Sequence, residues 1–219
     1  MTRCRILGVN TTHTRGLDAE DQSVRLRAAL AVGTDAEPEM MEALVHRCAV
    51  EPDFYVRDML TWALCRLPAD LTVPRLRAEL ASEQTQARSQ ALHTLSKIGD
   101  PQAWPDAKAL LHDEDDEVAR ASWRAAVALV PQGSESELAQ ELVRELGRGD
   151  RPVLLSASRA LASLGDWALP VLDAAEASTN PRVRAHAVAT RQLVNDPESS
   201  FAMSIELAKR VDAEGPNGG

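Results

Sequence analysis

Small and apolar residues recur along the chain at helical spacing, and the same pattern returns every 30 to 35 residues. The apolar residues that anchor the six copies are Val24, Val56, Ala87, Val118, Val153 and Val183. Positions four and eight after each anchor are also small or apolar, apart from Arg191 in the last copy. Because residues at these spacings share one face of an α-helix, every copy predicts a helix with one apolar side.

Each of these helices has a start signal three positions before its anchor. The residues there are Asp21, Asp53, Gln84, Asp115, Asp150 and Asn180. Most of them carry a side-chain oxygen that can accept from the free amides of a first helical turn. A second helical pattern lies between the copies, for example at 72–80, 136–147 and 167–175. Two helices per copy must stack on their neighbours to bury their apolar sides.

The pattern therefore predicts an all-α fold, an α-solenoid of the armadillo/HEAT-like type with about six helical-hairpin repeats. We expect the repeat domain to span 17–198 and a C-terminal capping helix to span 199–211. The ends, 1–16 and 212–219, lack helical periodicity, and we expect a flexible N-terminal segment and a disordered tail.

The repeated motif resembles the HEAT repeat family, in the short form of about thirty residues that bilin lyases also have. The resemblance rests on an Asp-bearing turn followed by "VRxxAxxAL", and covers about 18–195. It is carried by Val24-Arg25, Val56-Arg57, Ala87-Arg88 and Val183-Arg184. Ala119 and Leu154 stand where the fourth and fifth copies should have the Arg, which interrupts the ladder of Asp and Arg that the family implies.

Composition says more about the location of the protein and the classes of its partners than about its activity. The net charge of −9 argues against a chain whose whole surface coats nucleic acid or an anionic membrane. Cys4, Cys48 and Cys65 are odd in number and lack CxxC spacing, so we expect neither a disulfide framework nor a zinc site. No apolar run reaches the roughly 18 residues of a membrane span. We expect a cytoplasmic protein with no membrane attachment.

Helical geometry also predicts which side chains point away from the core. Positions two and six after each anchor lie opposite the apolar arc, with three and ten on its flanks. The HEAT resemblance implies that this row lines a concave inner groove. The predicted groove residues are Arg27, Asp58, Met59, Trp62, Arg66, Gln90, His93, Lys97, Arg120, Arg124, Arg159 and His186. An acidic protein would thus carry a groove that is basic at its middle.

Seven aromatic residues are unevenly spread, and three of them fall between 51 and 68. We expect Phe54 and Tyr55, at a helix start, to pack against the neighbouring repeat. Trp62 faces away from the apolar arc, and its exposure in the groove or its burial between repeats are left as equal alternatives. The remaining three tryptophans are expected to serve packing: Trp104, Trp123 and Trp167.

Sequence motifs of catalysis are missing. The chain has no Gly-rich phosphate loop, no GxSxG and no HExxH. Deoxyhypusine hydroxylase, an iron enzyme of similar repeats, holds its metal through His-Glu pairs, whereas no His here is followed by Glu. Nothing identifies a tetrapyrrole site of the bilin lyase kind. We expect no catalytic residues, no metal and no cofactor.

The sequence favours a non-enzymatic scaffold that binds a protein or peptide with acidic and apolar groups in the groove. Trp62 would be the apolar anchor, with Arg120, Arg124 and Arg159 pairing with acidic groups. The alternative is a DNA-binding or DNA-repair protein similar to the DNA alkylation repeat glycosylases, using the arginines, Trp62 and Asp58. The oligomeric state and the identity of the partner stay open.

Overall fold

The computed structural model describes residues 14–196, and these are helices joined by turns, without a strand among them. The predicted all-α fold is therefore confirmed. Residues 14–17 are helical, while the rest of the predicted N-terminal segment, the capping helix and the tail lie outside the described residues. Contacts between Cα atoms divide the chain into two units, Met1–Asp106 and Ala107–Gly219.

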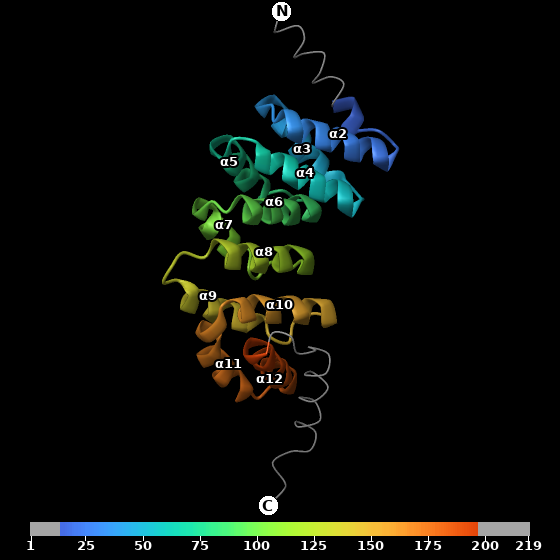
Figure 1. The fold of residues 1–219 in the computed structure, drawn as a ribbon. Coiled ribbons are helices and arrows are strands. Elements are labelled where there is room, and N and C mark those ends of the chain that lie inside the picture. The colour runs from blue at the N-terminus through green and yellow to red at the C-terminus, as the bar shows by residue number, and fades with distance from the viewer. Residues whose placement is uncertain (1–13, 197–219) are drawn as a thin grey trace, which may run out of the picture. The chain divides into compact units, whose positions relative to one another are not determined.

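The first unit is a stack of helix pairs in two layers (Figure 1). One layer holds α2, α4 and α6, in which α4 packs against both neighbours, and the other holds α3 and α5. The bounds are α2 Gln22–Asp35, η1 Pro38–Met40, α3 Met41–Val50, α4 Phe54–Arg66, α5 Ala69–Glu79, α6 Thr85–Ile98 and η2 Pro101–Ala103. The short helix α7, Trp104–Ala109, runs across the boundary between the units.

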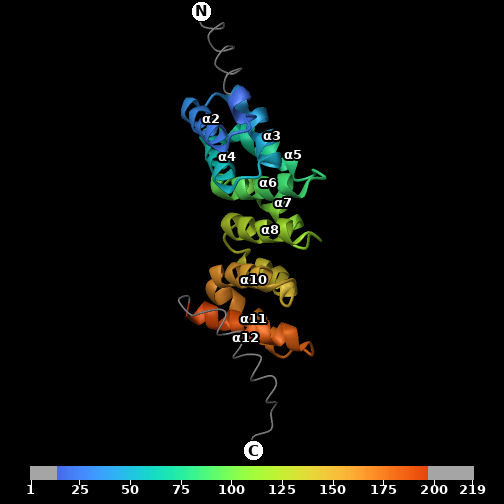
Figure 2. The ribbon, with the colours of Figure 1, turned by 90° about the vertical axis from the view of Figure 1, so that its right-hand side faces the viewer.

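The second unit repeats the arrangement, with α10 between α8 and α12 in one layer (Figure 2). Its elements are α8 Asp116–Leu129, α9 Glu135–Leu142, η3 Val143–Glu145, α10 Arg151–Ser163, η4 Gly165–Ala168, α11 Leu169–Glu176 and α12 Pro181–Asn195. The second helices predicted from sequence are present in both units, and 3-10 turns extend them at η3 and η4.

All six predicted helix starts are confirmed. The residues Asp21, Asp53, Gln84, Asp115, Asp150 and Asn180 are the N-caps of α2, α4, α6, α8, α10 and α12. Five of these side chains accept from backbone amides of the first turn, as Asp53 does from the Val56 N–H at 3.0 Å. Gln84 makes no such bond, since its longer side chain is a poor geometric match for the cap.

The apolar columns of the repeat form the core of each unit. Position four after the anchors is buried in every copy, from Ala28 to Ala187. Position eight is buried in the first five copies, and the polar exception in the sixth, Arg191, is only partly buried and pairs with Asp173 and Glu176. The largest buried side chain is Trp123, whose indole N–H donates to the Leu111 carbonyl at 2.8 Å.

The Arg that directly follows the anchor in four of the copies bonds the turn before its own helix. Arg57 Nη1 donates to the Glu51 and Pro52 carbonyls, at 2.9 and 2.8 Å, in the turn that precedes its own helix. Three further arginines make the same pair of bonds to their own turns: Arg25, Arg88 and Arg184. Each satisfies carbonyls that no helix or sheet would pair.

In the two copies that lack this Arg, an arginine from the following copy takes over. Arg148 Nη2 donates to the Asp113 and Glu114 carbonyls at 2.6 and 3.2 Å, which are the atoms that an Arg at position 119 would reach. Arg182 donates likewise to the Gly149 carbonyl in the fifth turn. The interruption seen in the sequence is thus repaired by side chains from a neighbouring repeat.

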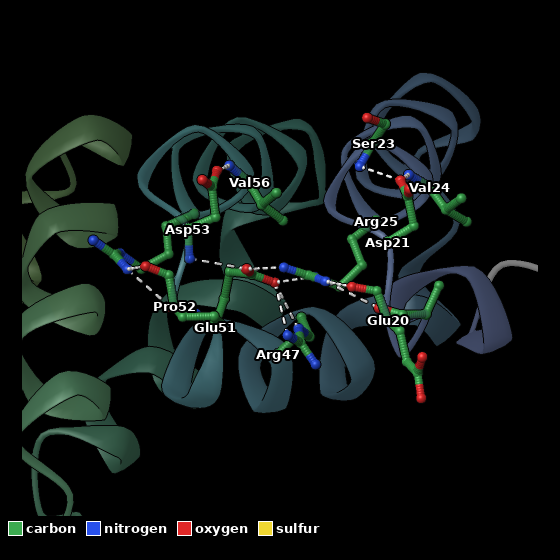
Figure 3. A network of polar contacts seen from close by, with 12 residues as sticks. Glu20, Asp21, Ser23, Val24, Arg25, Arg47, Glu51, Pro52, Asp53 and Val56 are labelled. Carbon is green, nitrogen blue, oxygen red and sulfur yellow. Dashed lines mark hydrogen bonds and ion pairs between the residues drawn. The ribbon is translucent and has the colours of Figure 1, made fainter.

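A buried ion network joins the first two repeats of unit 1 (Figure 3). The Glu51 carboxylate is inaccessible to solvent and accepts from Arg25 and Arg47, each at 2.8 Å. It also accepts from the Asp53 N–H at 3.0 Å. Burial raises the pKa of Glu51, but these donors outweigh it and hold the pKa below its ordinary value. The Glu51 carboxylate therefore stays charged and connects α2 to α3 through Arg25 and Arg47.

Candidate functional site

A groove with a volume of about 500 Å³ lies between α8 and α10 in the second unit. From α8 it receives Arg120, Arg124 and Val127, which follow one another at helical spacing on one face. From α10 it receives two such stripes, one of Arg151, Leu155, Arg159 and Ser163, the other of Pro152, Ser156 and Ala160. The result is an apolar lining with four guanidinium groups around it.

These four guanidinium groups are left without anionic partners. Within the described residues, no hydrogen bond or ion pair joins Arg120, Arg124, Arg151 or Arg159 to a carboxylate. The Nε of Arg120 is buried and has no acceptor among them. Although Arg124 as a whole is exposed, desolvation of its guanidinium, followed by the charge of Arg120, lowers its pKa below the ordinary value against the opposing effect of Glu117. The positive charge of the groove is therefore opposed by nearby Glu117 but not neutralised by a bonded carboxylate of the described residues.

Arginines elsewhere in the same unit behave differently. Arg148 binds Asp116 and Glu145, at 2.8 and 2.9 Å, and Arg144 binds Glu141 at 2.8 Å. The chain has more Asp and Glu than Lys and Arg, so a cluster of arginines without a bonded carboxylate is a specific feature of this groove. It concentrates donors where a ligand can reach them.

One end of the groove is acidic. A second hollow of about 470 Å³ shares Arg120, Arg124 and Pro152 with the first. Its other lining residues include Asp116, Glu117 and Asp150, at the starts of α8 and α10. The side chain of Asp150 caps α10, and that of Asp116 is held by Arg148. The groove thus passes from an arginine cluster to a short acidic rim.

Trp62 belongs to the first unit and is both packed and exposed. A Cβ built on Gly33 would lie 2.2 Å from Cζ3 of Trp62, so the indole rests on α2 at a site that only glycine leaves open. The residue still exposes 39% of its surface, and Leu30, at the equivalent position of α2, exposes 47%. Both alternatives for Trp62 thus hold in part, because one side of the ring packs while the rest faces solvent.

The other predicted groove residues of the first unit follow the helical geometry. Those in the exposed class are Arg27, Asp58, Arg66 and Lys97, and those half-buried are Met59, Gln90 and His93. In the second unit Arg124 and Arg159 are exposed, and Arg120 is half-buried. Arg151 was not among the predicted groove residues because it lies two positions before its anchor, Val153. An Arg directly after the predicted N-cap Asp150 was the signal that could have indicated it.

His186 is the exception, and its assignment to the groove is wrong. Only 2% of it is exposed. Its Nδ1 accepts from the Gly147 N–H at 2.9 Å, and its Nε2 lies 2.8 Å from Ser158 Oγ and 3.0 Å from the Leu154 carbonyl oxygen. Burial lowers the pKa of His186 to about 4. The neutral ring is a packing residue between α10, α12 and the turn after η3.

Two of the aromatic predictions are also corrected. Phe54 and Tyr55 expose 65% and 69% of their surfaces and contact each other edge to face, with ring centroids 5.6 Å apart. Trp167, on η4, is 54% exposed. A side chain at the start of a helix is therefore not necessarily covered by the neighbouring repeat. Trp104 and Trp123 are buried as expected.

The family comparison matches the stack just described. Residues 41–128 fit the family model described as HEAT repeats. This segment is a run of HEAT repeats. No protein of curated function is similar in sequence to the chain. The HEAT assignment agrees with the turn arginines and N-caps, which lie at equivalent places inside and outside the matched segment.

Solved structures similar to this chain come from proteins of different kinds. Human deoxyhypusine hydroxylase in complex with glycerol shares 19% identity, covering 94% of this chain and 95% of its own, with a TM-score of 0.48. An engineered protein shares 18%, covering 92% and 97%, at 0.45. The CpcE–CpcF complex of phycocyanin lyase from Nostoc sp. PCC7120 shares 17%, covering 92% and 93%, at 0.36. At these scores nothing follows for the activity of this chain.

Two further features are absent from residues 14–196. Between residues 14 and 196 no three His, Cys, Asp or Glu side chains gather in a way that could hold a metal ion. No helix in that part of the chain is long and apolar enough to cross a membrane. Among the described residues, the arginine groove combines a hollow with guanidinium groups that no carboxylate bonds.

Proposed function

We propose that this HEAT-repeat protein is a non-enzymatic scaffold that binds an acidic segment of a partner protein in the groove between α8 and α10. The observation that carries the proposal is the cluster of Arg120, Arg124, Arg151 and Arg159 around an apolar lining, without carboxylate partners among the described residues. Arginine in a concave, partly apolar surface is a frequent energetic centre of protein interfaces.

Charge accounts for the direction of the preference. Guanidinium groups that lie close together repel one another, and a carboxylate placed between them removes this cost and gains charge-assisted hydrogen bonds. Leu155 and Val127 provide apolar contact for side chains next to the acidic residue. The ligand thus combines acidic and apolar groups.

Trp62 is proposed as an apolar anchor on the surface of the first unit. Its ring is held in place by α2 at Gly33 while part of it stays accessible, so little side-chain freedom is lost on binding. Exposed Leu30 extends the apolar area. Each of the two surfaces belongs to its own unit, and each is tested separately.

The experiment for the arginine groove uses fluorescence anisotropy with a labelled peptide of alternating glutamate and leucine. The matched peptides carry glutamine or lysine in place of glutamate, and a labelled DNA duplex represents the nucleic-acid alternative. The protein variants are Arg124→Gln/Arg159→Gln and the control Arg77→Gln/Arg144→Gln. The control removes two positive charges outside the groove, from Arg77, which pairs with Asp106, and from Arg144, which pairs with Glu141. Circular dichroism checks that both variants keep their helices.

We expect the acidic peptide to bind wild type, and its affinity to fall about tenfold or more, about 1.4 kcal/mol, in the groove variant but not in the control. Equal loss in both variants would show that only net charge matters. Tighter binding of the duplex, with an affinity that falls steeply with salt, would favour the DNA reading. Trp62→Ala should leave the groove peptide's affinity unchanged and weaken a partner that docks on the first unit.

A further inference from the structure

The arginine groove holds more positive charge than one carboxylate can neutralise. Arg120 and Arg124 project from successive turns of α8, and Arg151 and Arg159 lie two turns apart on α10 along the same groove. A carboxylate brings one negative charge and two oxygens, which suits one guanidinium fork. Three further guanidinium groups would stay without a bonded carboxylate among the described residues, with Glu117 near Arg124 as an additional negative charge.

The positions of Arg120 and Arg124 also favour a ligand with several acceptor oxygens. The Nε of Arg120 is enclosed and has no acceptor among the described residues, so this guanidinium is not neutralised from within the protein. Arg124 stands beside Arg120, and burial and the charge of that neighbour lower its pKa. A ligand oxygen at this point would serve both side chains, while its other oxygens face α10.

We propose, on the basis of the proposed function, that the groove selects a phosphorylated side chain, so that the partner segment is a phosphopeptide. A phosphate monoester carries about −1.5 to −2 charges at pH 7 and three acceptor oxygens, which can bond guanidinium groups from two helices at once. Arginine clusters are a recurrent solution for this ligand because the planar fork matches phosphate oxygens.

The acidic rim and the apolar lining favour a peptide as the source of the phosphate. Asp116, Glu117 and Asp150 lie beyond the arginines at one end, where the next phosphate of a nucleic acid strand would be repelled. An isolated phosphate on a peptide meets no such neighbour. Val127 and Leu155 line the groove among the arginines and suit an apolar residue adjacent to the phosphorylated one.

The test uses a labelled peptide in which a single central position is flanked by leucine and glycine. That position is serine, phosphoserine or glutamate, and binding is measured by anisotropy on the full chain. Protein variants are Arg124→Gln on α8 and Arg159→Gln on α10, each alone, with Arg144→Gln as the control. Unlabelled DNA duplex and inorganic phosphate serve as competitors.

We expect the phosphoserine peptide to bind at least about tenfold more tightly than the glutamate peptide, and each groove variant to remove most of this preference while Arg144→Gln keeps it. If glutamate and phosphoserine bind alike and both depend on the groove, the phosphate inference is wrong and the proposed function stands. If neither peptide depends on the groove, both are wrong. Competition by duplex or free phosphate at equal phosphate concentration would refute a peptide source.

Discussion

Arg148 should contribute more to the stability of the second unit than any surface arginine, because it serves two purposes. It pairs with the Glu145 carboxylate, whose side chain is only 8% exposed, and it donates to the two turn carbonyls at Asp113 and Glu114. Its guanidinium also lies 6.0 Å from the centre of the Trp123 ring. Removing it leaves a buried carboxylate whose remaining side-chain partner is His112.

The expected cost of Arg148→Ala follows from these contacts. Breaking a buried ion pair costs about 3 to 5 kcal/mol, and the surviving contact with His112 places the value near the lower end, at about 3 kcal/mol. Arg144→Ala is the matched control, because its side chain is 64% exposed and its pair with Glu141 is worth about 0 to 1 kcal/mol. Urea unfolding followed by far-UV circular dichroism measures both.

A loss below about 1 kcal/mol for Arg148→Ala, or one equal to that of the control, would refute the idea that Arg148 takes the place of the missing repeat arginine. The sharper arm is the double variant Ala119→Arg/Arg148→Ala, which restores the arginine to its own repeat. If the two positions are equivalent, part of the lost stability returns in the double variant. No recovery would mean that the Glu145 pair, rather than the turn, explains the effect.

Two further predictions concern pH and capping. The pKa of His186 is about 4 in the folded protein against 6.5 for the free side chain, so the unfolded chain takes up a proton first and stability falls by up to about 3 kcal/mol as pH drops from 6.5 to 4. His186→Gln should lack this part of the loss in urea unfolding at the two pH values, and equal slopes would contradict the assignment. Asp53→Ala should cost about 1 kcal/mol through its cap bond, whereas Gln84→Ala, with no cap bond to lose, should cost close to nothing in the same assay.

The fold was readable from the sequence because its determinants are local. A capping side chain acts on amides two or three residues away, and the apolar columns depend only on helical spacing. This is why the start of α12 at Asn180 could be predicted as well as that of α4 at Asp53. The same spacing placed Arg124 and Arg159 on an accessible face.

The sequence did not predict which side chains are buried by a neighbouring element. His186 has an outward position on its own helix, yet Gly147 and Ser158 from other elements enclose it. Phe54 is the opposite case, since it contacts Tyr55 beside it but stays 65% exposed among the described residues. The replacement of a missing arginine by Arg148 likewise depends on the register between repeats, which no single repeat encodes.

The borrowed arginines also lengthen the stretch of sequence that is needed to complete a turn. During synthesis from the N-terminus, the turns of the first three repeats can be completed at once, since Arg25, Arg57 and Arg88 follow closely behind them. The fourth turn must wait for Arg148 and the fifth for Arg182. The bonds of these two turns join residues 33 to 35 positions apart, against 5 or 6 in the first turn, so a longer piece of chain must be present before they can form.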